Sequence, residues 1–148
     1  MQRSTLDHHL REYLMVGGFP EVQGVELRDR VALLNSYVDV MVLRDVLERH
    51  RVSNPLALRW LERQLLANPG GAFSVKMHFD TLRSQGLRAA KDTMREYLDP
   101  LEDAFPVRTI SMPSRSERQC LVNPRKAYPV DTGLITQPTR RLPTRCHC

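Results

Sequence analysis

Three groups of helix-breaking residues constrain this chain most, because they divide it into separate helical segments. Two glycines and a proline occur together in Gly17–Pro20, and Asn68–Gly71 holds a second such group. Neither group can continue a helix, since proline lacks a backbone N–H and glycine is a poor helix former. Gly86 is a single-residue break of the kind that allows a tight turn between two helices. The sequence therefore predicts a set of short helices.

Apolar residues recur at helical spacing between these breaks. A first helix is expected near residues 4–16, with Leu6, Leu10, Tyr13 and Leu14 on one face. A longer helix is expected from Glu26 to His50, with an apolar stripe at alternating four- and three-residue intervals that suits a partner helix. The members of this stripe are Leu27, Val31, Leu34, Val38 and Met41.

A third helix is expected after Ser53-Asn54-Pro55, where a capping side chain precedes a proline in the first turn. Its predicted inner face holds Leu58, Leu61 and Leu65, with Trp60 beside them.

The segment from Phe73 to Phe105 predicts a helix-turn-helix, with Gly86 at the turn and the second helix starting near Lys91. Pro100 lies inside this second helix and predicts a kink or an early end near Asp99. Two short strands, 107–110 and 119–122, are expected to follow around a polar loop at 114–117. A helix-turn-helix followed by such a hairpin is a winged helix.

We therefore expect a mainly α fold, in which a helical region is followed by a winged helix-turn-helix with a small β-hairpin wing. The expected boundaries are 1–70 for the helical region, 71–134 for the winged-helix domain and 135–148 for a disordered basic tail. Hydrophobic residues make up 41% of the 148 residues, enough for a core.

Positive charge is concentrated in the C-terminal third. Residues 1–105 hold 14 Lys/Arg and 15 Asp/Glu, a net charge of −1, whereas residues 106–148 hold 8 and 2, a net charge of +6. This bias predicts that contacts with phosphate groups, where they occur, involve the region after the helices.

Several phrases, in this order and spacing, resemble a family of uncharacterised prokaryotic ATPases in which a P-loop domain precedes a domain of unknown function. The phrases are Tyr13–Glu21, Arg44–Val46 with Glu48–His50, Asn68–Ser74, Ser84–Phe105 and Asn123–Leu134. The resemblance implies a full-length protein with an AAA+-like nucleotide-binding domain, a middle winged helix and a C-terminal part similar to restriction endonucleases. It also implies that region 1–70 is similar to an ATPase lid.

The chain departs from that pattern at several points. It contains no Gly-x-x-x-x-Gly-Lys-Ser/Thr, so the backbone cradle for phosphates is absent from this sequence. The acidic nuclease-like motif expected after Gly133-Leu134 is replaced by a basic, cysteine-terminated tail, and prolines stand at three positions where the family pattern has other residues. These prolines are Pro100, Pro106 and Pro129. We expect a truncated or altered copy, with ATP and Mg²⁺ belonging only to the full-length family.

The candidate nucleic-acid-binding residues are cations of the recognition helix and of the wing. They are Lys91, Arg95, Arg108, Arg115, Arg118, Arg125 and Lys126. The helix also carries five carboxylates, so the wing is the better candidate, since each phosphate contact needs a cation. The alternative is a solvated basic loop.

Arg44 and Asp45 interrupt the apolar stripe of the long helix. By resemblance they would lie beside the ATPase core, where an arginine could sense nucleotide phosphate. The alternative is a structural ion pair that fixes the position of the helix.

No catalytic arrangement and no metal site are expected. Cys120, Cys146 and Cys148 match no standard zinc spacing, and His8, His9 and His78 have no partner ligands at suitable spacing. No signal peptide or membrane helix is predicted, so the expected location is the cytoplasm.

Two functions from different classes remain, besides a remnant without function. The first is a non-catalytic regulatory or nucleic-acid-binding module of an AAA+-like protein, with DNA as its partner. The second is a protein-interaction module that packs on an ATPase domain or on a second copy of the chain.

Overall fold

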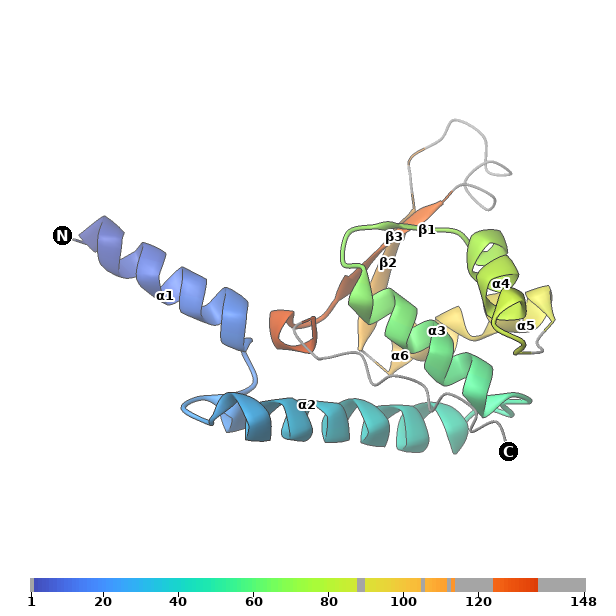
Figure 1. The fold of residues 1–148 in the computed structure, drawn as a ribbon, viewed down its shortest axis with the longest axis horizontal. Helices are drawn as coiled ribbons and strands as arrows, with labels where there is room; N and C mark the ends of the chain where they lie inside the picture. Colours follow the sequence, from blue (N-terminus) through green and yellow to red (C-terminus); the bar gives the residue numbers. More distant parts are fainter. Residues whose placement is uncertain (1, 88–89, 105, 112, 114–123, 136–148) are drawn as a thin grey trace.

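The computed structural model describes residues 2–87, 90–104, 106–111, 113 and 124–135. It is mainly helical, with a small three-stranded antiparallel sheet, and this confirms the predicted class (Figure 1). The predicted strand 119–122, the loop 114–117 and residues 136–148 of the predicted tail lie outside the described residues.

The N-terminal half consists of three long helical segments. Helix α1 spans Gln2–Val16 and α2 spans Leu27–Met41, with a short 3-10 turn, η1 (Pro20–Val22), between them. The prediction of one helix from Glu26 to His50 is wrong in its last part. After Met41 the backbone changes to a π-helical segment, η2 (Val42–Leu47), in which the Glu48 N–H donates to the Leu43 carbonyl.

Helix α3 (Pro55–Ala67) begins as the sequence predicts. The Asn54 side chain accepts a hydrogen bond from the Ala57 N–H at 3.1 Å, and Pro55 occupies the first turn, where no N–H is needed. Most of this helix is buried, including Leu58, Leu61 and Trp60. The Trp60 Nε1–H donates to Gln85 Oε1 at 2.7 Å and so ties α3 to the turn after α4.

The predicted helix-turn-helix corresponds to α4 (Val75–Ser84) followed by α5 (Lys91–Glu96) and α6 (Leu98–Asp103). Gly86 has a φ of 78°, the left-handed conformation expected at the turn. The helix divides at Tyr97, two residues earlier than predicted. Pro100 is the third residue of α6, where its missing N–H would have no partner within the helix, so α6 continues through it.

The sheet combines β1 (Ala72–Phe73), β2 (Val107–Ser111) and β3 (Arg125–Pro129) in the order β1-β3-β2, with both pairings antiparallel. Among the described residues, the strand that pairs with β2 is therefore 125–129. The polar, proline-containing sequence of 125–129 concealed this strand, and the two-residue β1 is too short to give an alternating pattern.

Two apolar clusters form the core. The larger cluster joins η2, α3, α4, α5, α6 and the sheet, and it includes Val46, Leu61, Leu82, Met94 and Ala127. The smaller cluster joins α2 to η1, to Leu66 of α3 and to Leu134 in the 3-10 turn η3 (Thr132–Leu134). Leu34 and Val38 of the predicted stripe are buried here, whereas Leu27 at its start is exposed. Helix α3 contributes to both clusters.

Tyr97, at the break between α5 and α6, is buried and fixes the start of α3. Its phenol oxygen accepts a hydrogen bond from the Asn54 N–H at 2.8 Å and lies 3.1 Å from Ser53 Oγ.

We predict that Tyr97→Phe lowers the free energy of unfolding by about 1–3 kcal/mol, because the Asn54 N–H loses its partner in a partly buried position. Urea unfolding followed by circular dichroism measures this change. Tyr128→Phe is the matched control, since Tyr128 is exposed and should be nearly neutral. Equal stability of the two variants would contradict the structural role of Tyr97.

Candidate functional site

The hairpin formed by β2 and β3 presents two basic side chains and one tyrosine on one face. Val107 and Ala127 are buried, while Arg108, Lys126 and Tyr128 are exposed, as expected for strands whose side chains alternate between two faces. In the register, Arg108 lies opposite Tyr128 and Ile110 lies opposite Lys126. We call these four residues, Arg108, Ile110, Lys126 and Tyr128, the outward sheet face.

Tyr128 is positioned by the loop that precedes β1. The Gly70 N–H donates to the Ala127 carbonyl at 2.7 Å, and Gly70 has a φ of 69°. A Cβ atom at Gly70 would lie 3.3 Å from Cε1 of the tyrosine ring. The ring is therefore held beside the Gly70 backbone, with the side chain 39% exposed. Lys126 is two residues away on the same strand, so both basic residues of this face are neighbours of Tyr128.

The structure separates Arg125 from the other two wing cations that it describes, Arg108 and Lys126. Arg125 is next to Lys126 in sequence but points to the opposite side of the strand, where it is half-buried and its register partners are Phe73 and Ser111. Arg115 and Arg118 lie outside the described residues. Of the five predicted wing cations, the structure therefore brings Arg108 and Lys126 together on one face.

The predicted recognition helix is acidic at its surface. Lys91 is the first residue of α5 and Arg95 is exposed, but exposed carboxylates surround Arg95 along α5 and α6. These are Asp92, Glu96, Asp99 and Asp103. Glu102 has a structural role instead, because its carboxylate accepts hydrogen bonds from the backbone N–H and the hydroxyl of Thr109 in β2.

Arg44 and Asp45 lie in the π-helical segment η2, a conformation that often occurs at functional sites. Asp45 pairs with Arg49, at 3.2 Å, one turn later, while Arg44 is exposed. Asp45, Arg49, His50, Asp103 and Ala104 line a cavity of about 320 Å³. Asp45 is therefore one half of a local ion pair with Arg49 at the wall of this cavity, and the two roles weighed for Arg44 stay predictions.

Histidines do not form a metal site in the part of the chain that the structure describes, where no group of three or more metal-binding side chains occurs. His78 is packed between Phe73 and Trp60, with ring centroids 4.6 and 6.0 Å away. Burial lowers the pKa of His78, and a hydrogen bond with the Ser74 carbonyl opposes this shift. His78 is thus a half-buried residue whose ring packs against Phe73 and Trp60.

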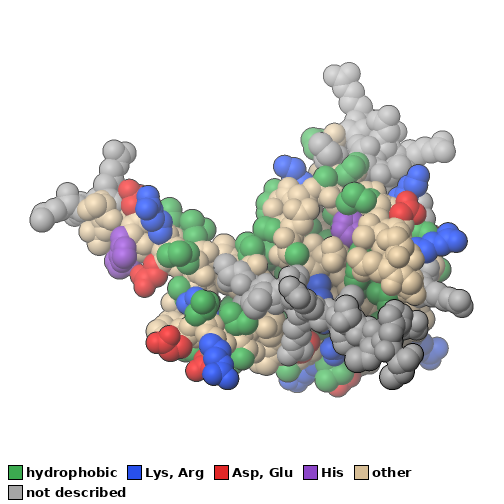
Figure 2. All heavy atoms as spheres, viewed as in Figure 1, with side chains coloured by type: hydrophobic (Ala, Val, Ile, Leu, Met, Phe, Trp, Pro, Cys, Tyr) green, Lys and Arg blue, Asp and Glu red, His purple; other side chains and the backbone are tan. Residues whose placement is uncertain are grey.

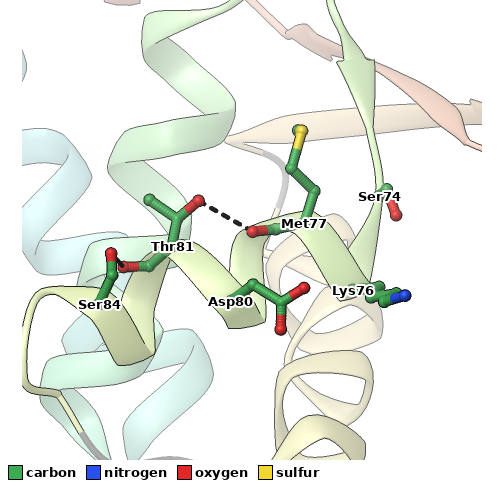
Figure 3. A pocket seen from close by; sticks show the side chains of 6 residues that line it. All are labelled: Ser74, Lys76, Met77, Asp80, Thr81 and Ser84. Carbon is green, nitrogen blue, oxygen red and sulfur yellow. Dashed lines mark hydrogen bonds between the residues drawn. The ribbon is translucent and has the colours of Figure 1, made fainter.

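A shallow depression runs along the exposed side of α4, lined by Ser74, Lys76, Met77, Asp80, Thr81 and Ser84 (Figure 3). The hydroxyls of Thr81 and Ser84 donate to carbonyls of their own helix, at 2.9 and 2.7 Å. Their donors are therefore already used, and a single helix supplies nearly the whole surface.

Helix α1 exposes much of its apolar face. Leu6 is 67% exposed and Leu10 55%, and Tyr13, Leu14 and Met15 are similarly open. The helix projects from the rest of the chain (Figure 1), and Figure 2 shows hydrophobic side chains among the charged ones on its surface. The face predicted from sequence exists, but the described residues of the chain leave it largely uncovered.

A junction that sequence reasoning missed holds the end of α1 to the end of the described chain. The Asp131 carboxylate accepts hydrogen bonds from the Gly18 N–H at 2.6 Å and the Gly133 N–H at 2.7 Å. A Cβ atom at Gly17 would lie 2.8 Å from the Gly133 Cα. Gly17 and Gly133 must therefore both lack a side chain for their two backbone segments to lie this close together. Gly18 and Asp131 are 113 residues apart in the sequence, and only the fold brings them together.

Glu62 is the buried carboxyl group of α3, with 6% of the residue exposed. Burial raises its pKa from 4.5 to about 7, with Asp39 adding to the shift and Arg63 and Arg59 opposing it. Asp39 itself pairs with Arg59 at 3.6 Å across the α2–α3 contact. No local sequence pattern marks this residue, because a glutamate in an amphipathic helix is normally solvated.

Comparison with known proteins shows the family. A model of a domain of unknown function, DUF8612, matches residues 7–143, and the chain therefore belongs to this family. The chain is similar to an uncharacterised protein, MJ1544, of Methanocaldococcus jannaschii, with 26% identity over 106 residues, and to an uncharacterised protein of Haemophilus influenzae, with 30% identity over 104 residues.

These alignments cover 71% and 70% of the chain but 24% and 26% of the relatives, so the chain spans about a quarter of their length. No solved structure matches. Among the described residues, no helix combines the length and apolar character needed to cross a bilayer.

The position of Glu62 predicts a pH-dependent stability. Above about pH 4.5 the unfolded chain releases a proton that the folded chain keeps until about pH 7, so stability falls as the pH rises through this window. Glu62→Gln removes the ionisation and should raise the free energy of unfolding at pH 8 by up to about 3 kcal/mol, with a smaller effect at pH 5. Urea unfolding at both pH values measures this. A variant that is less stable than wild type at pH 8 would show that the charge is stabilised.

Proposed function

We propose that this chain is a non-catalytic winged-helix module of a larger ATPase-type protein, and that it contacts nucleic acid through the hairpin. The winged-helix assignment is supported by the element order α3-β1-α4-α5/α6-β2-β3 and by a sheet in which β3 pairs with both other strands. In this assignment α3 is the first helix of the module, because it packs in the same cluster as α4, α5 and the sheet.

The larger parent protein is proposed from two observations. The matched relatives are about four times as long as the aligned segment, and the quoted phrases resemble the region that follows a P-loop domain. This chain has no Gly-x-x-x-x-Gly-Lys-Ser/Thr of its own. ATP and Mg²⁺ would therefore be bound by the parent protein, and the chain alone is expected to have no ATPase activity.

The outward sheet face carries the nucleic-acid proposal. Phosphate contacts supply most of the non-specific affinity for nucleic acids, and each contact requires a cation. Lys126 and Arg108 share one face of the hairpin, whereas Arg95 stands among carboxylates that repel a polyanion. The contact is therefore assigned to the hairpin and not to the helix α5.

We predict that Lys126→Ala weakens binding of the chain to DNA and reduces the slope of log Kd against log salt concentration by about 1. Fluorescence anisotropy at several salt concentrations measures both quantities. Arg95→Ala is the matched control, because it removes one exposed cation from the helix and should leave the slope unchanged. Loss of binding in Arg95→Ala alone would place the contact on the helix.

A second candidate function is self-association through α1. The exposed leucines of α1 form an apolar face of the kind that marks interaction surfaces, and a second copy of the chain presents the same face for a symmetric contact.

This candidate predicts a dimer in sedimentation or size-exclusion measurements, which Leu10→Asp converts to a monomer. Leu56→Asp is the control, since Leu56 is 62% exposed at the start of α3, away from this face. A wild-type chain that stays monomeric at high concentration would exclude the dimer.

A further inference from the structure

The charged residues of the three strands are all basic. The three strands together contain Arg108, Arg125 and Lys126 and no aspartate or glutamate. Two of these cations point outward, next to Tyr128, which is the aromatic residue of this face. Lys126 is the principal phosphate-binding candidate, because Arg108 already has an interaction partner.

Tyr128 is placed to offer a ring to a ligand. The Gly70 backbone lies against the ring, and Gly70 is fixed by its hydrogen bond to the Ala127 carbonyl. Residues directly opposite each other in an antiparallel pair have Cβ atoms about 4.5–5.5 Å apart, so Arg108 lies within reach of anything stacked on Tyr128. A held, exposed ring beside two cations is an arrangement that suits the bases and phosphates of a single strand.

We propose that the outward sheet face binds single-stranded nucleic acid, with one base stacked on Tyr128 and a neighbouring phosphate paired with Lys126. This inference rests on the proposed function and narrows its ligand class. A duplex keeps its bases stacked on one another and shows a protein only their edges and the phosphates. A single strand exposes the base faces that Tyr128 can use.

The acidic surface of α5 and α6 supports the same choice. In a helix-turn-helix that reads duplex DNA, the second helix enters the major groove close to both phosphate backbones. Asp92 and Glu96 of α5 and Asp99 at the start of α6 are exposed and would meet those phosphates. A single strand on the sheet requires no insertion of the helix, so these carboxylates do not oppose its binding.

The test compares a labelled short single-stranded oligonucleotide of mixed sequence with the duplex of the same sequence, by fluorescence anisotropy. We expect the chain to bind the single strand at least about tenfold more tightly than the duplex. Tyr128→Leu should weaken single-strand binding about 5- to 100-fold, which corresponds to the loss of one base stack, and should leave duplex binding within twofold. Tyr128→Phe keeps the aromatic ring and should bind within about twofold of wild type.

The outcomes separate this inference from the proposed function. Equal or tighter duplex binding, or Tyr128→Leu equal to Tyr128→Phe, overturns the single-strand inference, while the hairpin contact survives if Lys126→Ala still weakens binding. Absence of binding by the wild-type chain overturns both. Far-UV circular dichroism of each variant verifies that a loss of affinity is not caused by a loss of fold. Tyr128→Phe shows whether the tyrosine contributes to binding through its stacked ring or through its hydroxyl group.

Discussion

Burial of α3 on several sides is the constraint on which the rest of the structure depends. Leu58, Leu61 and Leu65 fill the larger apolar cluster, while Leu66 reaches the smaller one. Because one rigid helix belongs to both clusters, α2 with its π-helical end and the sheet take fixed positions relative to each other. The hydrogen bonds of Tyr97 at its start and of Trp60 on its side tie α4, α5 and α6 to it.

This packing explains why the surface is divided into regions of different character. The sheet uses Val107 and Ala127 to cover the core, and strand alternation then directs Lys126 and Tyr128 outward. Glu102 joins α6 to β2 through its hydrogen bonds with Thr109. The other acidic residues of α5 and α6 are exposed. Basic and acidic surfaces therefore arise from neighbouring elements of the same small unit.

Much of the helical fold could be predicted from sequence, because its signals are local. Asn54 and Pro55 start α3 and Gly86 makes the turn, and each acts through its own backbone preference. The sheet was harder to predict from the sequence, since β1 has two residues and β3 contains Pro129. Its pairing is decided by contacts distant in sequence, which a local pattern does not record.

The candidate site was predictable only as a set of residue types. From the sequence, Arg125 and Lys126 are equally good candidates because both are cations. Their side chains point to opposite faces of the sheet, which follows from the pairing of β3 with β2. No local pattern singles out Tyr128, because its position beside Lys126 and Arg108 depends on the pairing of β2 with β3. The Asp131 junction depends on a turn that meets Gly17 and Gly18 from the other end of the chain.

Mapping amide chemical shifts during titration with a short single strand shows whether the outward sheet face is the contact surface for nucleic acid. We expect the shifts to concentrate at residues 70, 108–110 and 126–128 and to be small throughout α5. Shifts concentrated in α5, with an unchanged sheet, would contradict this expectation.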